Sequence, residues 1–168
     1  YFDRYNSLIN NQELIDLLEQ YNLELIFYPH YEMQVYVDLF KTQSDKVIIA
    51  KKDEYDVQQL LKESKILITD YSSVAFDFAY MRKPVIYYQF DNDIYYKGHY
   101  QKGYFDYEEH GFGPVVKQLE ELQLCLGRIL NSGAENPYKN RCEVFFEKYD
   151  KKNSERIYNA IDNLKFDI

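Results

Sequence analysis

Short apolar segments that alternate with helix-like segments constrain the fold of this chain more than any other feature. The apolar segments lie near residues 23–28, 46–50, 66–69 and 85–88. Between them the chain has a helical spacing of apolar residues or a polar, helix-forming composition. Strands and helices that alternate in this way predict a parallel sheet covered by helices on both faces. The expected fold class is α/β, with at least four strands in one sheet.

The rest of the chain predicts a loop and a helical C-terminal part. Residues 89–116 hold four of the six glycines and show no sustained period, so we expect a long functional loop there. Three closing helices are expected at about 117–131, 137–149 and 153–165. Asn153 or Ser154 is placed to cap the last of them. The chain is expected to form a single domain.

Composition and charge exclude several classes of function. The 168 residues carry 20 basic and 28 acidic side chains, and the net charge of −8 disfavours binding to nucleic acid. No apolar run approaches the length of about 18 residues that a transmembrane helix needs. Cys125 and Cys142 are the only cysteines, and no histidine lies near either at ligand spacing. We therefore expect reduced thiols, a cytoplasmic location, and neither a metal site nor another cofactor.

Polar side chains follow two of the predicted strands. His30 follows the first strand, and Asp70, Ser72 and Ser73 follow the third. Ligands of parallel α/β sheets bind at the carboxyl ends of the strands, so these residues are expected at one edge. Each also has a simpler explanation. His30 could be a histidine that is hydrogen-bonded to the backbone after a proline, and Asp70 could merely end a strand.

The segment "ITDYSSVAFDFAYMRKPVIYY" (68–88) favours an anion site. Its helix, expected at about 73–82, begins with hydroxyl groups and no carboxylate, although helices commonly place acidic residues at their positive ends. If Ser72 caps this helix, the free N–H groups that follow could hold a phosphate. Asp77 lies one turn further along the same face and could accept from a ligand hydroxyl. The alternative is that Ser72 only caps the helix and Asp77 is solvated.

Two further features bear on a ligand site. Lys97, His99 and Lys102 make the best positive patch in an acidic chain that would bind a diphosphate. Nineteen tyrosines and eleven phenylalanines make the chain 18% aromatic. Aromatic residues in such number either pack in the core and at interfaces or line a groove, and the sequence leaves both possibilities open.

Beyond these patterns, the segment "ILITDYSSVAFDFAYMRKPVIYYQFD" resembles the signature of the CDP-glycerol glycerophosphotransferase family, the teichoic-acid polymerases and their capsule-making relatives. The segment "LELIFYPHYEMQ" is similar to the strand and histidine of that family. The segments "YYKGHYQKGYFDYEEHGFGPVV" and "RCEVFFEKYDKKNSERIYNAI" resemble its later parts. The resemblance covers about residues 20–165.

The resemblance implies a two-domain GT-B architecture. The chain is similar only to the C-terminal, Rossmann-like domain that binds the nucleotide donor. Residues 1–168 would then be a fragment that lacks the N-terminal acceptor domain and the first strand of the donor domain. That strand would normally lie between the first and third strands named above, so we expect the sheet to close up in a shorter order. The isolated fragment is expected to be inactive.

The resemblance also implies an activity. The family transfers an alditol phosphate from a CDP-alditol to a hydroxyl of a growing polymer or lipid-linked acceptor, releases CMP, and requires no metal. His30 matches a histidine needed for activity, and Ser72, Ser73 and Asp77 match donor-binding positions beside Asp70. Lys102 and Gly103 stand where relatives carry Arg-Gly. The full-length enzyme is expected at the inner face of a bacterial membrane.

Other functions stay open at this point. A GT-B glycosyltransferase that uses a nucleotide sugar and a non-catalytic interaction module are both compatible with the motifs. A receiver domain is disfavoured, because the required acidic cluster and downstream lysine are absent in the needed order. The sequence does not distinguish glycerol from ribitol, general acid from charge stabiliser for His30, or one oligomeric state from another.

Overall fold

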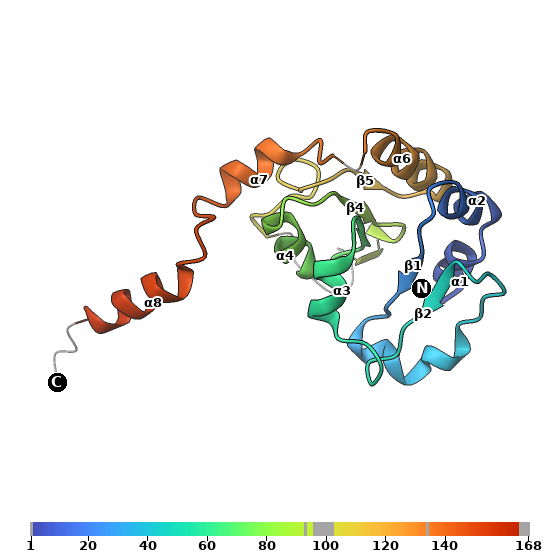
Figure 1. Cartoon of the computed structure of the whole chain (residues 1–168), viewed down its shortest axis with the longest axis horizontal. Coiled ribbons are helices and arrows are strands. Elements are labelled where there is room, and N and C mark those ends of the chain that lie inside the picture. The colour runs from blue at the N-terminus through green and yellow to red at the C-terminus, as the bar shows by residue number, and fades with distance from the viewer. Residues whose placement is uncertain (1, 93, 96–102, 134, 165–168) are drawn as a thin grey trace.

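The computed structural model describes residues 2–92, 94–95, 103–133 and 135–164 (Figure 1). The elements, in chain order, are α1 (Phe2–Ile9), α2 (Gln12–Gln20), β1 (Leu25–Phe27), the 3-10 helix η1 (Tyr31–Leu39), β2 (Val47–Ile49), α3 (Val57–Glu63), β3 (Leu67–Thr69), α4 (Val74–Tyr80), β4 (Val85–Tyr88), β5 (Val115–Val116), α6 (Leu119–Asn131), α7 (Lys139–Phe145) and α8 (Asn153–Asp162). The α/β fold class is confirmed, and each of the four predicted strands is present.

All the strand pairs are parallel, but the strands form two ladders rather than one sheet. β1 pairs with β2, and β3, β4 and β5 form a separate ladder in that order. The expectation that the sheet closes up into one ladder is therefore wrong. The two ladders are held together by side chains, because β1, β3 and β4 all contribute to one hydrophobic core with α1, α2 and α6.

Strand β4 is the centre of the molecule, because both of its faces are buried. Ile86 and Tyr88 point into the core shared with α1, α2 and α6. Val85 and Tyr87 point the opposite way, into a second core with α4, Phe112 and α7. Residues that alternate along a strand face opposite sides, and burial of both sides is typical of a parallel sheet covered by helices.

Several boundaries differ from the sequence expectation. The segment after His30 forms 3-10 turns, and Met33 N–H donates to His30 O at 2.7 Å. Helix α4 ends at Tyr80, earlier than expected, because Arg82 adopts a left-handed backbone with φ of 59°. The long loop ends in the two-residue strand β5, which the sequence did not predict.

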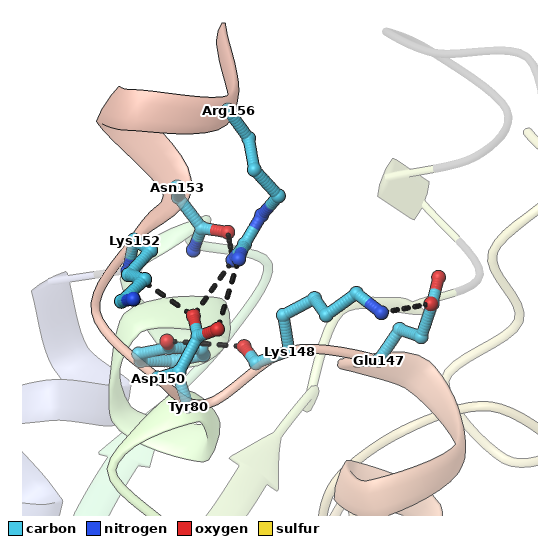
Figure 2. Close-up of polar contacts among 7 residues, drawn as sticks. All are labelled: Tyr80, Glu147, Lys148, Asp150, Lys152, Asn153 and Arg156. Atoms are coloured by element: carbon cyan, nitrogen blue, oxygen red, sulfur yellow. Dashed lines mark hydrogen bonds and ion pairs between the residues drawn. The ribbon is translucent and has the colours of Figure 1, made fainter.

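Helix α7 packs on the second core through Cys142, and α8 leads away from the body of the molecule (Figure 1). Neither Asn153 nor Ser154 caps α8: the N-cap is Lys152, which makes no side-chain cap bond. Instead, Arg156 forms two hydrogen bonds with Asp150, at 2.9 and 3.0 Å (Figure 2). This pair fixes the start of α8 to the segment before it. Within the described ranges, no helix is both long and apolar enough to cross a membrane.

Candidate functional site

The carboxyl ends of the two ladders meet around Tyr5 of α1. Its ring packs on Phe27, the last residue of β1, and on Phe90, which follows β4, with ring centroids 5.4 and 5.5 Å apart. Its hydroxyl donates to Asp70 Oδ2 at 3.1 Å, directly after β3. One residue of α1 therefore joins the end that leads to His30 with the end that leads to the two serines.

His30 is the exposed residue at the start of η1. Its Nδ1 accepts a hydrogen bond from the Glu32 N–H at 3.4 Å, so the backbone-bonded histidine considered from the sequence is present. An accepting Nδ1 leaves the proton of the neutral ring on Nε2. The outer nitrogen of His30 is thus a hydrogen-bond donor directed away from its own backbone contact.

Gln34 holds the backbone around His30, and no sequence pattern pointed to it. This buried side chain donates from Nε2 to the carbonyls of Pro29, at 3.1 Å, and Ala50, at 3.4 Å. Its Oε1 accepts from the Lys52 N–H at 3.0 Å. These bonds join the segments that follow β1 and β2, so they fix the position from which His30 projects.

Asp70 is committed to contacts within the protein. Its Oδ1 accepts from the Tyr71 N–H at 2.7 Å, and its Oδ2 accepts from Tyr5. The carbonyl of Asp70 accepts from Nε2 of Gln89, which is completely buried, at 3.1 Å. Direct binding of a donor by Asp70 stays a prediction. These contacts fix the backbone immediately before Ser72 and Ser73.

Ser72 and Ser73 form the turn between β3 and α4. The N-cap of α4 is Ser73 rather than Ser72, and it makes no side-chain cap bond, so the expectation that Ser72 caps is wrong. Among the described residues, neither hydroxyl has a hydrogen-bond partner. Because α4 begins at Val74, Asp77 lies in its first turn, which corrects the expectation of a first turn without a carboxylate. Asp77 is exposed, as a ligand contact or a solvated residue would be.

The predicted loop residues are only partly described. Gly103 is exposed, and a Cβ added there would meet no described residue within 4 Å, so packing against the described part does not require glycine at this position. Lys102, Lys97 and His99 lie outside the described residues. Within the described residues, no hydrogen bond links His30 to the serine turn, and their convergence on one anion stays a prediction.

Several tyrosines surround the serine turn. Tyr71 stacks on Tyr95 with ring centroids 3.6 Å apart and an interplanar angle of 3°. Tyr107 packs edge-on against Tyr71 and donates from its hydroxyl to the Tyr71 carbonyl at 3.2 Å. The number of tyrosines in the sequence is compatible with core packing and with a groove. In the structure these three tyrosines contact one another and the backbone beside the serine turn.

Two cavities of the described part lie away from the predicted site residues. One of about 830 Å³ is bounded by α1, α2 and residues 39–45, and none of the predicted site residues lines it. Several polar groups on its wall already bond one another; for example, Asn10 Nδ2 donates to the carbonyls of Asn6 and Lys41. The described residues include no group of three or more His, Cys, Asp or Glu side chains placed to hold a metal ion.

Comparison with protein families gives one match that spans nearly the whole chain. The family described as CDP-Glycerol:Poly(glycerophosphate) glycerophosphotransferase matches residues 1–163. This range includes every residue that the sequence analysis placed in the site.

Individual proteins give the same result. The chain is 40% identical over 166 residues to the minor teichoic acid biosynthesis protein GgaB of Bacillus subtilis (strain 168), covering 96% of this chain and 17% of that protein. It is 33% identical over 137 residues to the teichoic acid glycerol-phosphate transferase of Staphylococcus aureus (strain NCTC 8325 / PS 47), covering 79% and 33%. The chain thus spans a minor part of the length of these relatives.

The solved structures include the wall teichoic acid polymerase TagF, in a variant soaked with CDPG. That structure aligns with a TM-score of 0.61 at 24% identity and covers 95% of this chain and 48% of that chain. The likeness shows a shared fold over almost all of the 168 residues.

Proposed function

This chain belongs to the CDP-glycerol:poly(glycerophosphate) glycerophosphotransferase family, and from that premise we propose that it binds a CDP-alditol for the transfer of an alditol phosphate. The observation that carries the proposal is the family match over residues 1–163. The proposed product is a teichoic-acid-like or capsular polymer, and the by-product is CMP.

In the proposed reaction, an acceptor hydroxyl attacks the phosphorus that bears the alditol. The new P–O bond forms to the acceptor as the bond to CMP breaks, and the hydroxyl proton is lost to solvent or a base. Negative charge develops on the phosphoryl oxygens and on the departing CMP, so fixed hydrogen-bond donors stabilise the transition state. The hydroxyls of Ser72 and Ser73, which have no partner among the described residues, are proposed as such donors.

His30 is assigned the leaving-group side of this reaction. Its Nδ1 is occupied by a backbone N–H, so Nε2 is the nitrogen that can donate to the oxygen of departing CMP. That hydrogen bond would offset the charge on the oxygen, whereas a charged imidazolium would form only if Nδ1 released the Glu32 N–H and took up a proton. Asp77 is assigned to a hydroxyl of the donor, and Lys102 with Gly103 to its diphosphate.

The acceptor is assigned to a part of the natural protein outside this chain. The chain covers 48% of the TagF chain, and every site residue proposed above is assigned to the donor. We assign it to the C-terminal half of a GT-B architecture that works at the inner face of a bacterial membrane, where a lipid-linked acceptor is available. The 168 residues alone should bind the donor weakly and transfer nothing, because in-line transfer needs a positioned acceptor.

The assay is CMP release by the natural protein that carries this chain, with a lipid-linked acceptor and either CDP-glycerol or CDP-ribitol. We expect release from one of these donors and none from UDP-glucose. His30→Ala should lower the rate by about a hundredfold or more, the usual contribution of a general acid, while the loss of its long bond to the Glu32 N–H should lower the thermal midpoint only slightly.

His110→Ala is the matched control. His110 Nδ1 also accepts from a backbone N–H, that of Asp106 at 3.0 Å, but it lies in the 103–116 segment and has no assigned role. Wild-type rates with His30→Ala would contradict the catalytic assignment. Transfer from a UDP-sugar alone would indicate a glycosyltransferase, and no nucleotide binding at all would indicate an interaction module.

A further inference from the structure

Tyr71, which directly precedes the serine turn, is anchored at four points. Its N–H donates to Asp70 Oδ1 at 2.7 Å, and its carbonyl accepts from Tyr107 Oη at 3.2 Å. Its own hydroxyl donates to Asp91 Oδ1 at 3.0 Å, and its ring stacks on Tyr95. The backbone and the side chain of Tyr71 are therefore both fixed. In three of the four contacts, the partner lies 20 or more positions away in the sequence.

The bond from Tyr107 acts directly on the serine turn. The carbonyl of Tyr71 and the N–H of Ser72 belong to the same planar, trans peptide unit, so they point in opposite directions. Fixing the Tyr71 oxygen therefore fixes the direction of the Ser72 N–H. The bond from Tyr71 N–H to Asp70 fixes the preceding peptide unit in the same manner.

The hydroxyl of each tyrosine, and not only its ring, makes these contacts. Core tyrosines such as Tyr87 are completely buried and pack through their rings. Tyr71 and Tyr107 are only half-buried, and their hydroxyls donate hydrogen bonds to other parts of the chain. Phenylalanine would keep the ring contacts and lose the anchors. This difference provides a test that separates positioning from packing.

We propose that Tyr71 and Tyr107 are positioning residues that aim the Ser72–Ser73 turn at the donor phosphates. The inference rests on the proposed function. It adds that the geometry of the turn is set by two tyrosines that do not themselves contact the substrate. Donors that are already fixed lose little freedom when the diphosphate binds, so a loosened turn should bind the diphosphate less well.

The experiment compares Tyr107→Phe with Tyr80→Phe in the natural protein. Tyr80 is the matched control, because its hydroxyl also donates to a backbone carbonyl, that of Lys148 at 3.1 Å, but at the far end of α4 (Figure 2). Tyr107→Phe should raise KM for the CDP-alditol by about three- to tenfold, the loss of one hydrogen bond, with little change in kcat. Tyr80→Phe should leave KM unchanged. Equal KM values in the two variants would overturn the proposal.

Conservative replacement of Asp91 provides an independent test of the Tyr71 anchor. Asp91→Asn keeps an oxygen that can accept from the Tyr71 hydroxyl and should retain a nearly normal KM, whereas Asp91→Ala should behave like Tyr71→Phe. Normal KM in both Asp91→Ala and Tyr71→Phe would show that this anchor has no role. An equal rise in Asp91→Asn and Asp91→Ala would assign the effect to charge instead, and would also contradict the proposal.

A ligand-free measurement separates this inference from the proposed function. Backbone NMR order parameters of Ser72 and Ser73 should fall in Tyr107→Phe and stay at wild-type values in Tyr80→Phe. If the wild-type protein releases no CMP from any CDP-alditol, the proposed function fails, and this measurement still decides whether the tyrosines hold the turn. Unchanged order parameters in Tyr107→Phe would overturn the positioning role.

Discussion

Gly113 allows the 103–116 segment to run against strand β4. A Cβ at this position would lie 1.7 Å from the carbonyl oxygen of Val85, which is part of the strand backbone and has no flexible side chain to move aside. The next residue, Pro114, accepts from the Tyr87 N–H at 2.9 Å, so the close approach is part of the ladder that holds β5.

Gly113→Ala should therefore destabilise the protein by about 3 kcal/mol or more, because β4 or the segment beside it must shift. Gly127→Ala is the control, and it is expected to change the free energy of unfolding in the opposite direction. Gly127 lies inside α6, where an added Cβ meets nothing within 4 Å, and alanine there should stabilise by up to about 1 kcal/mol. Urea unfolding of the three proteins measures both effects. A Gly113→Ala variant as stable as the wild type would show that the segment can move freely from β4.

Single residues also show how far the sequence could predict the site. The places of His30, Ser72 and Ser73 were predictable, because residues that follow parallel strands lie at the carboxyl edge of a sheet; their role in binding stays a prediction. Gln34 and the tyrosine anchors were not. Their partners are distant in sequence, as in the 36 residues between Tyr107 and Tyr71, and no periodicity records such contacts.

At the scale of elements, the strands were predictable and their grouping was not. Apolar runs bounded by polar turns locate β1 to β4, since the signal is local. The division into two ladders depends on which strand edges meet, which is a non-local property. The start of α8 was missed for a related reason: the sequence favoured a cap by Asn153 or Ser154, whereas Asp150 and Arg156 form an ion pair across the turn.

This ion pair makes the start of α8 sensitive to acid. Hydrogen bonds from Arg156 and then from the Lys152 N–H lower the pKa of Asp150 to about 2. Because the folded pKa is lowered, the stabilisation is present above the ordinary pKa near 3.8 and is lost as the pH falls toward 2. Asp150→Asn should weaken the first turn of α8 at pH 7, and Cα chemical shifts of residues 153–157 would report the loss of helix.

Asp162→Asn is the control for that change, since Asp162 is the last residue of α8 and lies far from the pair. It should leave the first turn intact. In the wild type, the same chemical shifts should hold from pH 7 to pH 4 and move toward coil values below that. Helical shifts in Asp150→Asn equal to those of the wild type at pH 7 would show that the pair does not hold the helix start.

The whole molecule is organised around the two cores on either side of β4, and Tyr87 lies at the centre of the second. Its side chain is completely buried, and its hydroxyl oxygen accepts from the Phe112 N–H at 3.4 Å. Burial raises the pKa of Tyr87 from 10.0 to about 12. An ionised tyrosine in this core would place a charge among aromatic rings, so folding and deprotonation of Tyr87 oppose one another.

The protein should therefore lose stability in alkali through this residue. Because the folded pKa is raised, the contribution of neutral Tyr87 is complete below pH 10 and is lost as the pH rises through 12, to a total of about 3 kcal/mol for a shift of this size. The free energy of unfolding, measured by urea at pH 8 to 12, should decline less steeply above pH 10 in Tyr87→Phe than in the wild type. Tyr158→Phe, which removes an exposed hydroxyl on α8, should keep the wild-type slope and so controls for the general rise in negative charge. If Tyr87→Phe and Tyr158→Phe give the same slope, alkaline unfolding is driven by overall charge repulsion, and the buried hydroxyl of the central strand is not what limits the stability of the fold.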